Sequence, residues 1–179
     1  MERGQMPAKS LGDTNIFGDK VELRSVKQSD FDVLFRWLNA PEVYRWWGGL
    51  PIDADVIRQK YLGLRRPQVD GFIIEVTGAP IGYAQRHQTR DDEGGIDLFL
   101  VPEMRGRGYG SDAVRALIEF LTECEGWKRI TVDPEQDNIS AQSFWRRLGF
   151  VETEQVTSEG NPVLIFNGSP HQSSNHESS

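Results

Sequence analysis

Residues 96–121 read IDLFLVPEMRGRGYGSDAVRALIEFL, an apolar run joined to a helical pattern by a glycine-rich loop. The apolar run predicts a strand over residues 94–101. Beyond the loop, aliphatic side chains recur at i, i+3, i+4 and i+7 and predict a helix over residues 111–123. The stretch KRITVDP predicts another strand at 128–134. A crossover of this length joins parallel strands, so we expect these two strands to be parallel.

The loop at 105–110, RGRGYG, lies between the end of a strand and the first turn of a helix. Unpaired N–H groups and the helix dipole attract anions at such a point. Its three glycines let the backbone take positive φ and approach a ligand, and its two arginines suit phosphate oxygens. The loop therefore predicts a pyrophosphate site, and a turn with solvated arginines is the alternative. It lacks the lysine of a Walker loop, and its G-x-G-x-G spacing differs from the dinucleotide fingerprint.

Composition limits the classes of function. A chain of 179 residues with 37% hydrophobic side chains predicts one globular domain. A net charge of −7 argues against a nucleic-acid partner and favours a cationic one. The single Cys124 excludes an internal disulfide, and with His171 and His176 in the polar tail no metal site is expected. No apolar run reaches the length of a signal peptide or membrane span, which predicts a cytoplasmic protein without a membrane partner.

The remaining pattern predicts a mixed α/β fold. We expect a single domain at 20–166, preceded by a flexible segment at 1–19 and followed by a disordered tail at 167–179. Further strands are predicted at 21–26, on both sides of the TGAP turn within 71–88, and in a hairpin at 150–156 and 162–168. Helices are predicted at 29–39, with Ser29 as the N-cap, at 53–63 and at 138–149, and an irregular loop at 41–49.

Two motifs together resemble the GNAT superfamily of N-acyltransferases. RGRGYG fits its R-x-x-G-x-G pyrophosphate loop, and Asn138, Ala141, Gly149 and Phe150 fit N-x-x-A-x-x-x-Y-x-x-x-G-F, with Trp145 in place of the usual tyrosine. The resemblance implies a GNAT-like α/β (α+β) fold with a mixed, mostly antiparallel central sheet flanked by helices, and acetyl-CoA as cosubstrate without a metal. The residues expected to bind the cofactor are Leu100, Val101, Arg105, Gly106, Arg107, Gly108, Tyr109, Gly110, Ser111, Asn138 and Trp145.

Within that superfamily, several stretches look like the aminoglycoside 6'-N-acetyltransferases. These are RWLNAPEVYRWWGG, PIGYAQ, GGIDLFL, ALIEFL and ITVDPEQDN. The resemblance implies that Asp97 matches the acidic residue near the reacting amine. It also implies that Trp47, Tyr61, Gln85 and Asp133 line the substrate cleft. Segment 86–95 is short where some members carry an aromatic flap, which leaves the acceptor amine open.

The chemistry of acetyl transfer gives these residues their expected roles. The reaction needs a neutral amine, a polarised thioester carbonyl and a proton for the departing thiolate. Asp97 is expected to attract the ammonium group and accept its proton, while the N–H groups near Leu100 and Val101 polarise the carbonyl. The alternative for Asp97 is a solvated strand residue or a backbone cap, and the alternative for Asp133 is a turn residue.

The aromatic residues have two interpretations each. Trp46 and Trp47 either form a wall for a sugar ring or cation, or belong to the loop alone. Trp145 packs in the core or walls the thiol, and its indole cannot act as a general acid. Arg146 and Arg147 are either solvated or reach a coenzyme A phosphate.

The leading functional hypothesis is transfer of acetyl from acetyl-CoA to a primary amine of a cationic small molecule, the 6'-amine of an aminoglycoside, in a ternary complex. Such an enzyme would confer antibiotic resistance. The alternatives are acetylation of a protein N-terminus or lysine, acetylation of a siderophore hydroxylamine, or a non-catalytic acyl-CoA sensor. A monomer or homodimer is expected.

Overall fold

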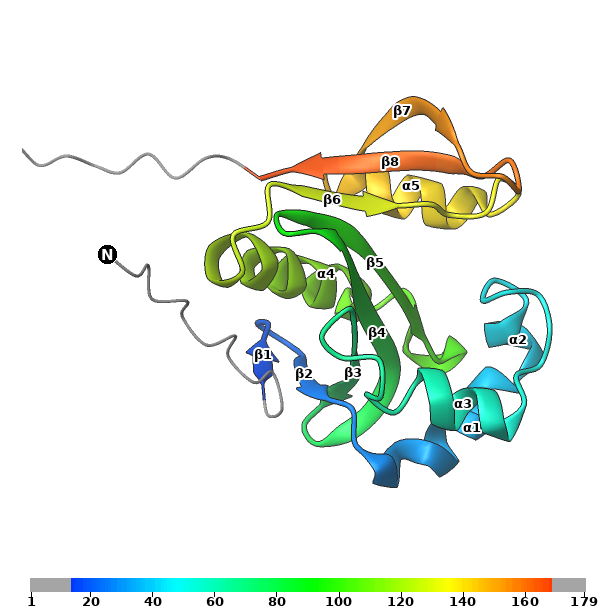
Figure 1. Cartoon of the computed structure of the whole chain (residues 1–179). Helices are drawn as coiled ribbons and strands as arrows, with labels where there is room; N and C mark the ends of the chain where they lie inside the picture. Colours follow the sequence, from blue (N-terminus) through cyan, green and yellow to red (C-terminus); the bar gives the residue numbers. More distant parts are fainter. Residues whose placement is uncertain (1–13, 169–179) are drawn as a thin grey trace, which may run out of the picture.

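The computed structural model describes residues 14–168 (Figure 1). Predictions for residues 1–13 and 169–179, the two tail histidines among them, lie outside that range. The strands are β1 (Asn15–Phe17), β2 (Glu22–Ser25), β3 (Val69–Val76), β4 (Ala79–Arg90), β5 (Glu93–Leu100), β6 (Arg129–Val132), β7 (Val151–Val156) and β8 (Pro162–Asn167). The helices are η2 (Gln28–Asp30), α1 (Phe31–Leu38), α2 (Pro41–Tyr44), α3 (Ala54–Lys60), η3 (Pro102–Met104), α4 (Tyr109–Glu119), η4 (Phe120–Cys124) and α5 (Ile139–Arg147).

The strands form one sheet in the order β1-β2-β3-β4-β5-β6-β8-β7. All neighbouring strands are antiparallel except β5 and β6, which are parallel, with α4 and η4 in the crossover between them. The mixed, mostly antiparallel sheet flanked by helices is therefore confirmed, as is the predicted parallel pair.

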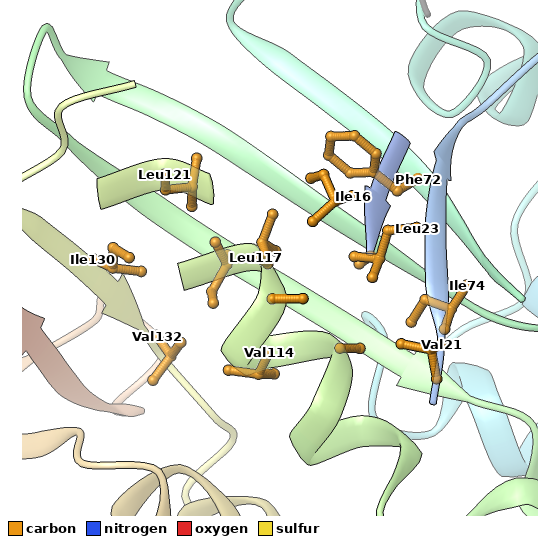
Figure 2. Packing of buried hydrophobic residues seen from close by; sticks show 14 of the residues in the cluster. Ile16, Val21, Leu23, Phe72, Ile74, Val114, Leu117, Leu121, Ile130 and Val132 are labelled. Atoms are coloured by element: carbon orange, nitrogen blue, oxygen red, sulfur yellow. The ribbon is translucent and has the colours of Figure 1, made fainter. Parts of the chain in front are cut away.

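Each face of the sheet carries its own hydrophobic core, because successive side chains of a strand point to opposite faces. On β3, Phe72 and Ile74 join a core formed with α4 and α5, whereas Ile73 joins a core formed with α1, α2 and α3. Figure 2 shows the first core, in which Val114 and Leu117 lie among residues of β1, β2, β3 and β6. In Figure 1, α1, α2 and α3 gather together beside the end of the central strands, away from α5.

The N-terminal part of the domain differs from the sequence prediction in three places. Residues 15–17 lie in the segment expected to be flexible, but Ile16 is buried and pairs with Leu23, so this part of the prediction is wrong. Pro41 begins α2 at its first position, where a missing N–H costs nothing, instead of opening an irregular loop. Ser29 is not the N-cap, because residues 28–30 form a 3-10 turn and the Asp30 carboxylate accepts the Lys27 N–H at 2.8 Å.

Candidate active site

A cleft of about 1620 Å³ opens where β5 and β6 separate. The two strands are paired only from Glu93 to Gly95, whose register partner is Thr131. Figure 1 shows them diverging beyond this point. Residues 96–100 then line one wall of the cleft and residues 132–138 line the other. The cleft therefore exposes part of β5 along the side that faces β6.

The glycine-rich loop forms one end of this cleft. Gly106 and Gly108 have φ values of 73° and 83°, in the left-handed region that favours glycine, and Gly108 is the N-cap of α4. The first-turn N–H groups of α4 have no intrahelical acceptor, so this point is the candidate anion site. Gly110 and Ser111 also line the cleft, but Gly110 lies within the helix and does not use a positive φ, contrary to prediction.

Arg105 braces this loop through backbone carbonyls. Its Nε donates to Leu100 O at 3.1 Å and its Nη2 donates to Glu42 O at 3.0 Å. The guanidinium group therefore ties the loop to the end of β5 and to α2. It keeps further donors for a phosphate, since a guanidinium group has five N–H bonds.

Three predicted cofactor residues are not among those that line the cleft. Val101 lines a smaller hollow of about 480 Å³, and its N–H donates to Ile81 O at 2.9 Å. That N–H is therefore not free to polarise a carbonyl group, contrary to prediction. Arg107 is exposed, and Tyr109 packs against the first hydrophobic core. Their backbone groups still belong to the anion site.

The predicted acceptor residues gather on the opposite side of the sheet from α4. Gln85 on β4 and Asp97 on β5 are register partners, and Gln85 Nε2 donates to Asp97 Oδ2 at 3.1 Å. The next pair on the same face, toward the turn between the strands, is His87 and Gly95. His87 Nδ1 lies 3.9 Å from Asp97 Oδ2. The amide and the imidazole thus approach the same carboxylate oxygen.

An aromatic cluster covers this face next to Asp97. Trp47 Nε1 donates to the Tyr61 hydroxyl at 2.9 Å, and the Trp47 ring packs edge-on against Phe99 with centroids 5.0 Å apart. Burial is the main cause that raises the pKa of Tyr61, so its hydroxyl stays protonated at neutral pH. Trp46 also lines the cleft and stacks under Arg45, whose Cζ lies 4.7 Å from the ring centroid. The two tryptophans therefore form a wall of the cleft.

Asp133 lies on the opposite wall, just after β6. Partial desolvation raises the pKa of its carboxyl group, and the negative charge of Asp97 raises it further, whereas His87 lowers it. The carboxylates of Asp97 and Asp133 therefore interact electrostatically across the cleft. Such a pair favours a ligand that carries positive charge.

The final helix contributes a cap and a wall. Asn138 Oδ1 accepts the Ala141 N–H at 3.1 Å and so caps α5, although Asn138 also lines the cleft. Trp145 is only 6% exposed and packs edge-on between Phe144 and Phe150, at 5.0 Å from each centroid. Because it also lines the cleft, Trp145 is both a core residue and part of the wall.

Of the two arginines that the sequence left open, Arg147 lines the cleft, whereas Arg146 pairs with Glu152 at 2.5 Å. Sequence reasoning missed several acidic residues of the cleft. Further acidic residues of the cleft wall are Glu42, Asp53, Glu135, Asp137 and Glu159. A Cβ on Gly108 would lie 3.1 Å from Lys20 Nζ, so this ammonium group stands beside the anion site. Most of these residues lie in loops without periodicity, so no pattern marks them, but His87 continues the alternation Tyr83, Gln85, His87 along β4.

The geometry combines an anion site at a helix N-terminus with an acidic group at the far end of the same cleft. Comparison with known families agrees with it: residues 20–151 match the acetyltransferase (GNAT) domain. The chain belongs to the GNAT acetyltransferase family. It is therefore an acetyl-CoA-dependent N-acetyltransferase, with acetyl-CoA as its cosubstrate.

Among characterised GNAT relatives, the chain is 33% identical over 166 residues to aminoglycoside N(6')-acetyltransferase type 1 of Klebsiella pneumoniae, covering 83% of this chain and 82% of that protein. Over 39% of this chain and 47% of the relative, it is 31% identical to spermine/spermidine N(1)-acetyltransferase of Bacillus subtilis. Its fold matches the structure of AAC(6')-Ib with paromomycin and acetyl-CoA at a TM-score of 0.75 and 30% identity, over 83% of this chain and 94% of that one.

Two observations on residues 14–168 complete the description of this GNAT domain. None of the helices there is long and apolar enough to cross a membrane. In the same range, no three His, Cys, Asp or Glu side chains are grouped so that they could hold a metal ion.

Proposed function

We propose that this GNAT enzyme transfers acetyl from acetyl-CoA to the 6'-amine of an aminoglycoside. The observation that carries the proposal is the pair of carboxylates, Asp97 and Asp133, that face a cleft whose other end is the glycine-rich loop. Acidic residues outnumber basic ones along this cleft. Of its basic residues, Arg105 lies in the glycine-rich loop and Arg147 lies on α5. The similarity to aminoglycoside N(6')-acetyltransferases supports the choice of acceptor.

The proposed reaction is direct attack in a ternary complex. Asp97 and Asp133 hold the ammonium group of the acceptor, and the aromatic wall of Trp46 and Trp47 covers the attached sugar ring. After the amine loses one proton, its lone pair attacks the thioester carbonyl carbon, the C–N bond forms and the C–S bond breaks. The second amine proton neutralises the thiolate. The chain contributes mainly by placing the two reactants together and by the charge of the cleft.

Trp145 cannot protonate the departing thiolate, because an indole N–H is not an acid at working pH. In this proposal it excludes water and fixes the position of the thiol. The proton then comes from the reacting amine or from solvent, and no side chain at this position needs to titrate.

Thiol release from acetyl-CoA tests the proposal with a matched pair of acceptors. Neomycin carries a 6'-amine where paromomycin carries a hydroxyl group, so we expect release with neomycin and none above background with paromomycin. Equal rates with both, or release only with spermidine or a peptide, would contradict the assigned acceptor.

A matched pair of variants tests the role of the carboxylate. We expect Asp97→Asn to lower kcat/KM for neomycin by about 10²–10⁴, the range for a general base. Asp32→Asn makes the same change on the exposed surface of α1, outside the cleft, and should leave kcat/KM unaltered. An Asp97→Asn enzyme as active as the Asp32→Asn control would remove Asp97 from the mechanism.

A further inference from the structure

His87 occupies a prepared position beside the acceptor carboxylate. Its Nδ1 lies 3.9 Å from Asp97 Oδ2, and the side chains of His87 and Asp97 are 40% and 34% exposed. Residues two apart on a strand share one face, so His87 lies on the same face as Gln85, which donates to the same oxygen of Asp97. The imidazole is therefore within reach of the acceptor carboxylate and of solvent, although His87 itself is not among the residues that line the cleft.

The position of the imidazole depends on the absence of a side chain at residue 95. A Cβ on Gly95 would overlap Cε1 of His87 and would lie 2.5 Å from its Nε2. The ring thus lies over the backbone of its own register partner on β5. Any larger residue at this point would push the ring away from Asp97.

Two carboxylates from different elements interact with the imidazole. Asp97 comes from β5, and Asp133, from the segment after β6, interacts electrostatically with His87. On the other side, the register partner of His87 on β3 is the apolar Val69. The imidazole therefore lies between an apolar neighbour on β3 and the two carboxylates.

We propose that His87 is the proton-accepting partner of Asp97 in acetyl transfer. This inference rests on the proposed function, because it needs an ammonium group bound at Asp97. One proton of that ammonium passes through the carboxylate to His87, and the imidazolium then releases it to solvent through its exposed edge. The amine lone pair forms the C–N bond, the C–S bond breaks, and the second amine proton goes to the thiolate sulfur.

The chemistry favours an imidazole in this place. A carboxylate ordinarily titrates near pH ~4 and an alkyl ammonium near pH ~10, so an aspartate alone is a weak acceptor for the amine proton. An imidazole titrates near pH ~6.5 and is better matched to a reaction at neutral pH. Once it is protonated, His87 pairs with Asp97 and competes with the ammonium group for the carboxylate. Acidic pH should therefore weaken the use of the acceptor while leaving the use of acetyl-CoA intact.

Two variants test the proposal in the full-length enzyme. We expect His87→Gln to lower kcat/KM for neomycin about 10²-fold at pH 7.5 and to remove the fall in kcat/KM between pH 7 and pH 5.5, with KM for acetyl-CoA unchanged. We expect free imidazole to restore activity to His87→Gly in proportion to its concentration. An unaltered acid limb in His87→Gln, or no rescue of a folded His87→Gly, would overturn the proposal, because a purely structural role gives neither signal.

A measurement without turnover separates this inference from the proposed function. The ring-proton resonances of His87, identified by their absence from the spectrum of His87→Gln, should shift in Asp97→Asn relative to the wild type at pH 7.5. Unchanged resonances in Asp97→Asn would show that the two groups are not coupled. Absence of acetylation of neomycin by the wild type would instead refute the proposed acceptor, whatever the spectra show.

Discussion

Asp112 joins the first turn of α4 to the segment before β2, and its replacement should be among the most costly surface-proximal changes in the domain. Its carboxylate accepts three backbone N–H groups, from Asp19 at 3.0 Å, Lys20 at 2.7 Å and Val21 at 2.9 Å. It is 8% exposed, and a negative charge in the first turn also favours the helix dipole. The anion site is thereby held against the N-terminal strands.

The expected cost follows from what each N–H loses in Asp112→Ala. The Val21 N–H becomes a buried unsatisfied donor, which costs about 1–3 kcal/mol, whereas water can replace the carboxylate at the exposed Asp19 and Lys20 for about 0.5 kcal/mol each. The free energy of unfolding should therefore fall by about 2–4 kcal/mol. For a domain of this size, that corresponds to a Tm lower by about 4–16 °C. Asp112→Asn keeps one acceptor oxygen and should lose roughly half as much.

Urea unfolding of a double-mutant cycle gives the sharpest test. A Cβ on Gly18 would overlap Oδ2 of Asp112 and lie 2.8 Å from its Cγ. Gly18→Ala should therefore destabilise the wild type, but cost almost nothing in the Asp112→Ala background, where the obstructing atoms are gone. An Asp112→Ala protein within about 0.5 kcal/mol of wild type would refute the hydrogen-bond reasoning. Equal costs of Gly18→Ala in both backgrounds would refute the packing reasoning.

Three further expectations concern the cleft. Asp133→Asn should raise Tm at neutral pH and raise KM for the acceptor. The pKa of Asp133 is raised, which means that folding disfavours its ionised form, so the gain in Tm should disappear as pH falls below the unfolded pKa of 3.8. A lower Tm of Asp133→Asn at pH 7 would contradict this sign. Trp145→Phe should keep turnover within about tenfold, since Trp145 only walls the thiol, whereas a loss of two orders of magnitude with unchanged acetyl-CoA affinity would assign it a chemical role. Gly108→Ala should lower the free energy of unfolding by about 1 kcal/mol. It should also weaken acetyl-CoA binding, measured by calorimetry, more than Gly106→Ala does, because only a Cβ at residue 108 meets a neighbour, Lys20 Nζ. Equal losses of affinity in the two variants would show that backbone strain alone is responsible.

Long periodic elements could be predicted from the sequence, and short ones could not. The strand, loop and helix at 94–123 combine two periodicities with glycines, and each appears near its predicted place. β1 has three residues and α2 has four, which is less than the repeat that a pattern needs. β1 forms because it pairs with β2, and α2 forms next to α1. Both contacts exist only in the folded chain.

The candidate site divides in the same way. The glycine-rich loop and Asp97 were marked by residue types that are unusual in their local setting, and the structure brings them to one cleft. The partners of these residues come from distant segments: Arg105 bonds the carbonyl of Glu42, and Val101 donates to Ile81. His87 faces Asp97 only through the register of β4 and β5. Such contacts are set by tertiary pairing, which no local pattern contains.

The parallel pairing of β5 with β6 is short, and the two strands separate beyond it. Hydrogen bonds hold the strands together at Gly95, two residues before Asp97, and the angular opening widens toward Leu100. The gap between the two strands therefore begins beside the acceptor carboxylate and leads toward the glycine-rich loop. A cofactor bound at that loop would reach Asp97 only with the end of its chain that carries the acetyl group. The point at which the two strands part thus fixes how near the two reactants can come.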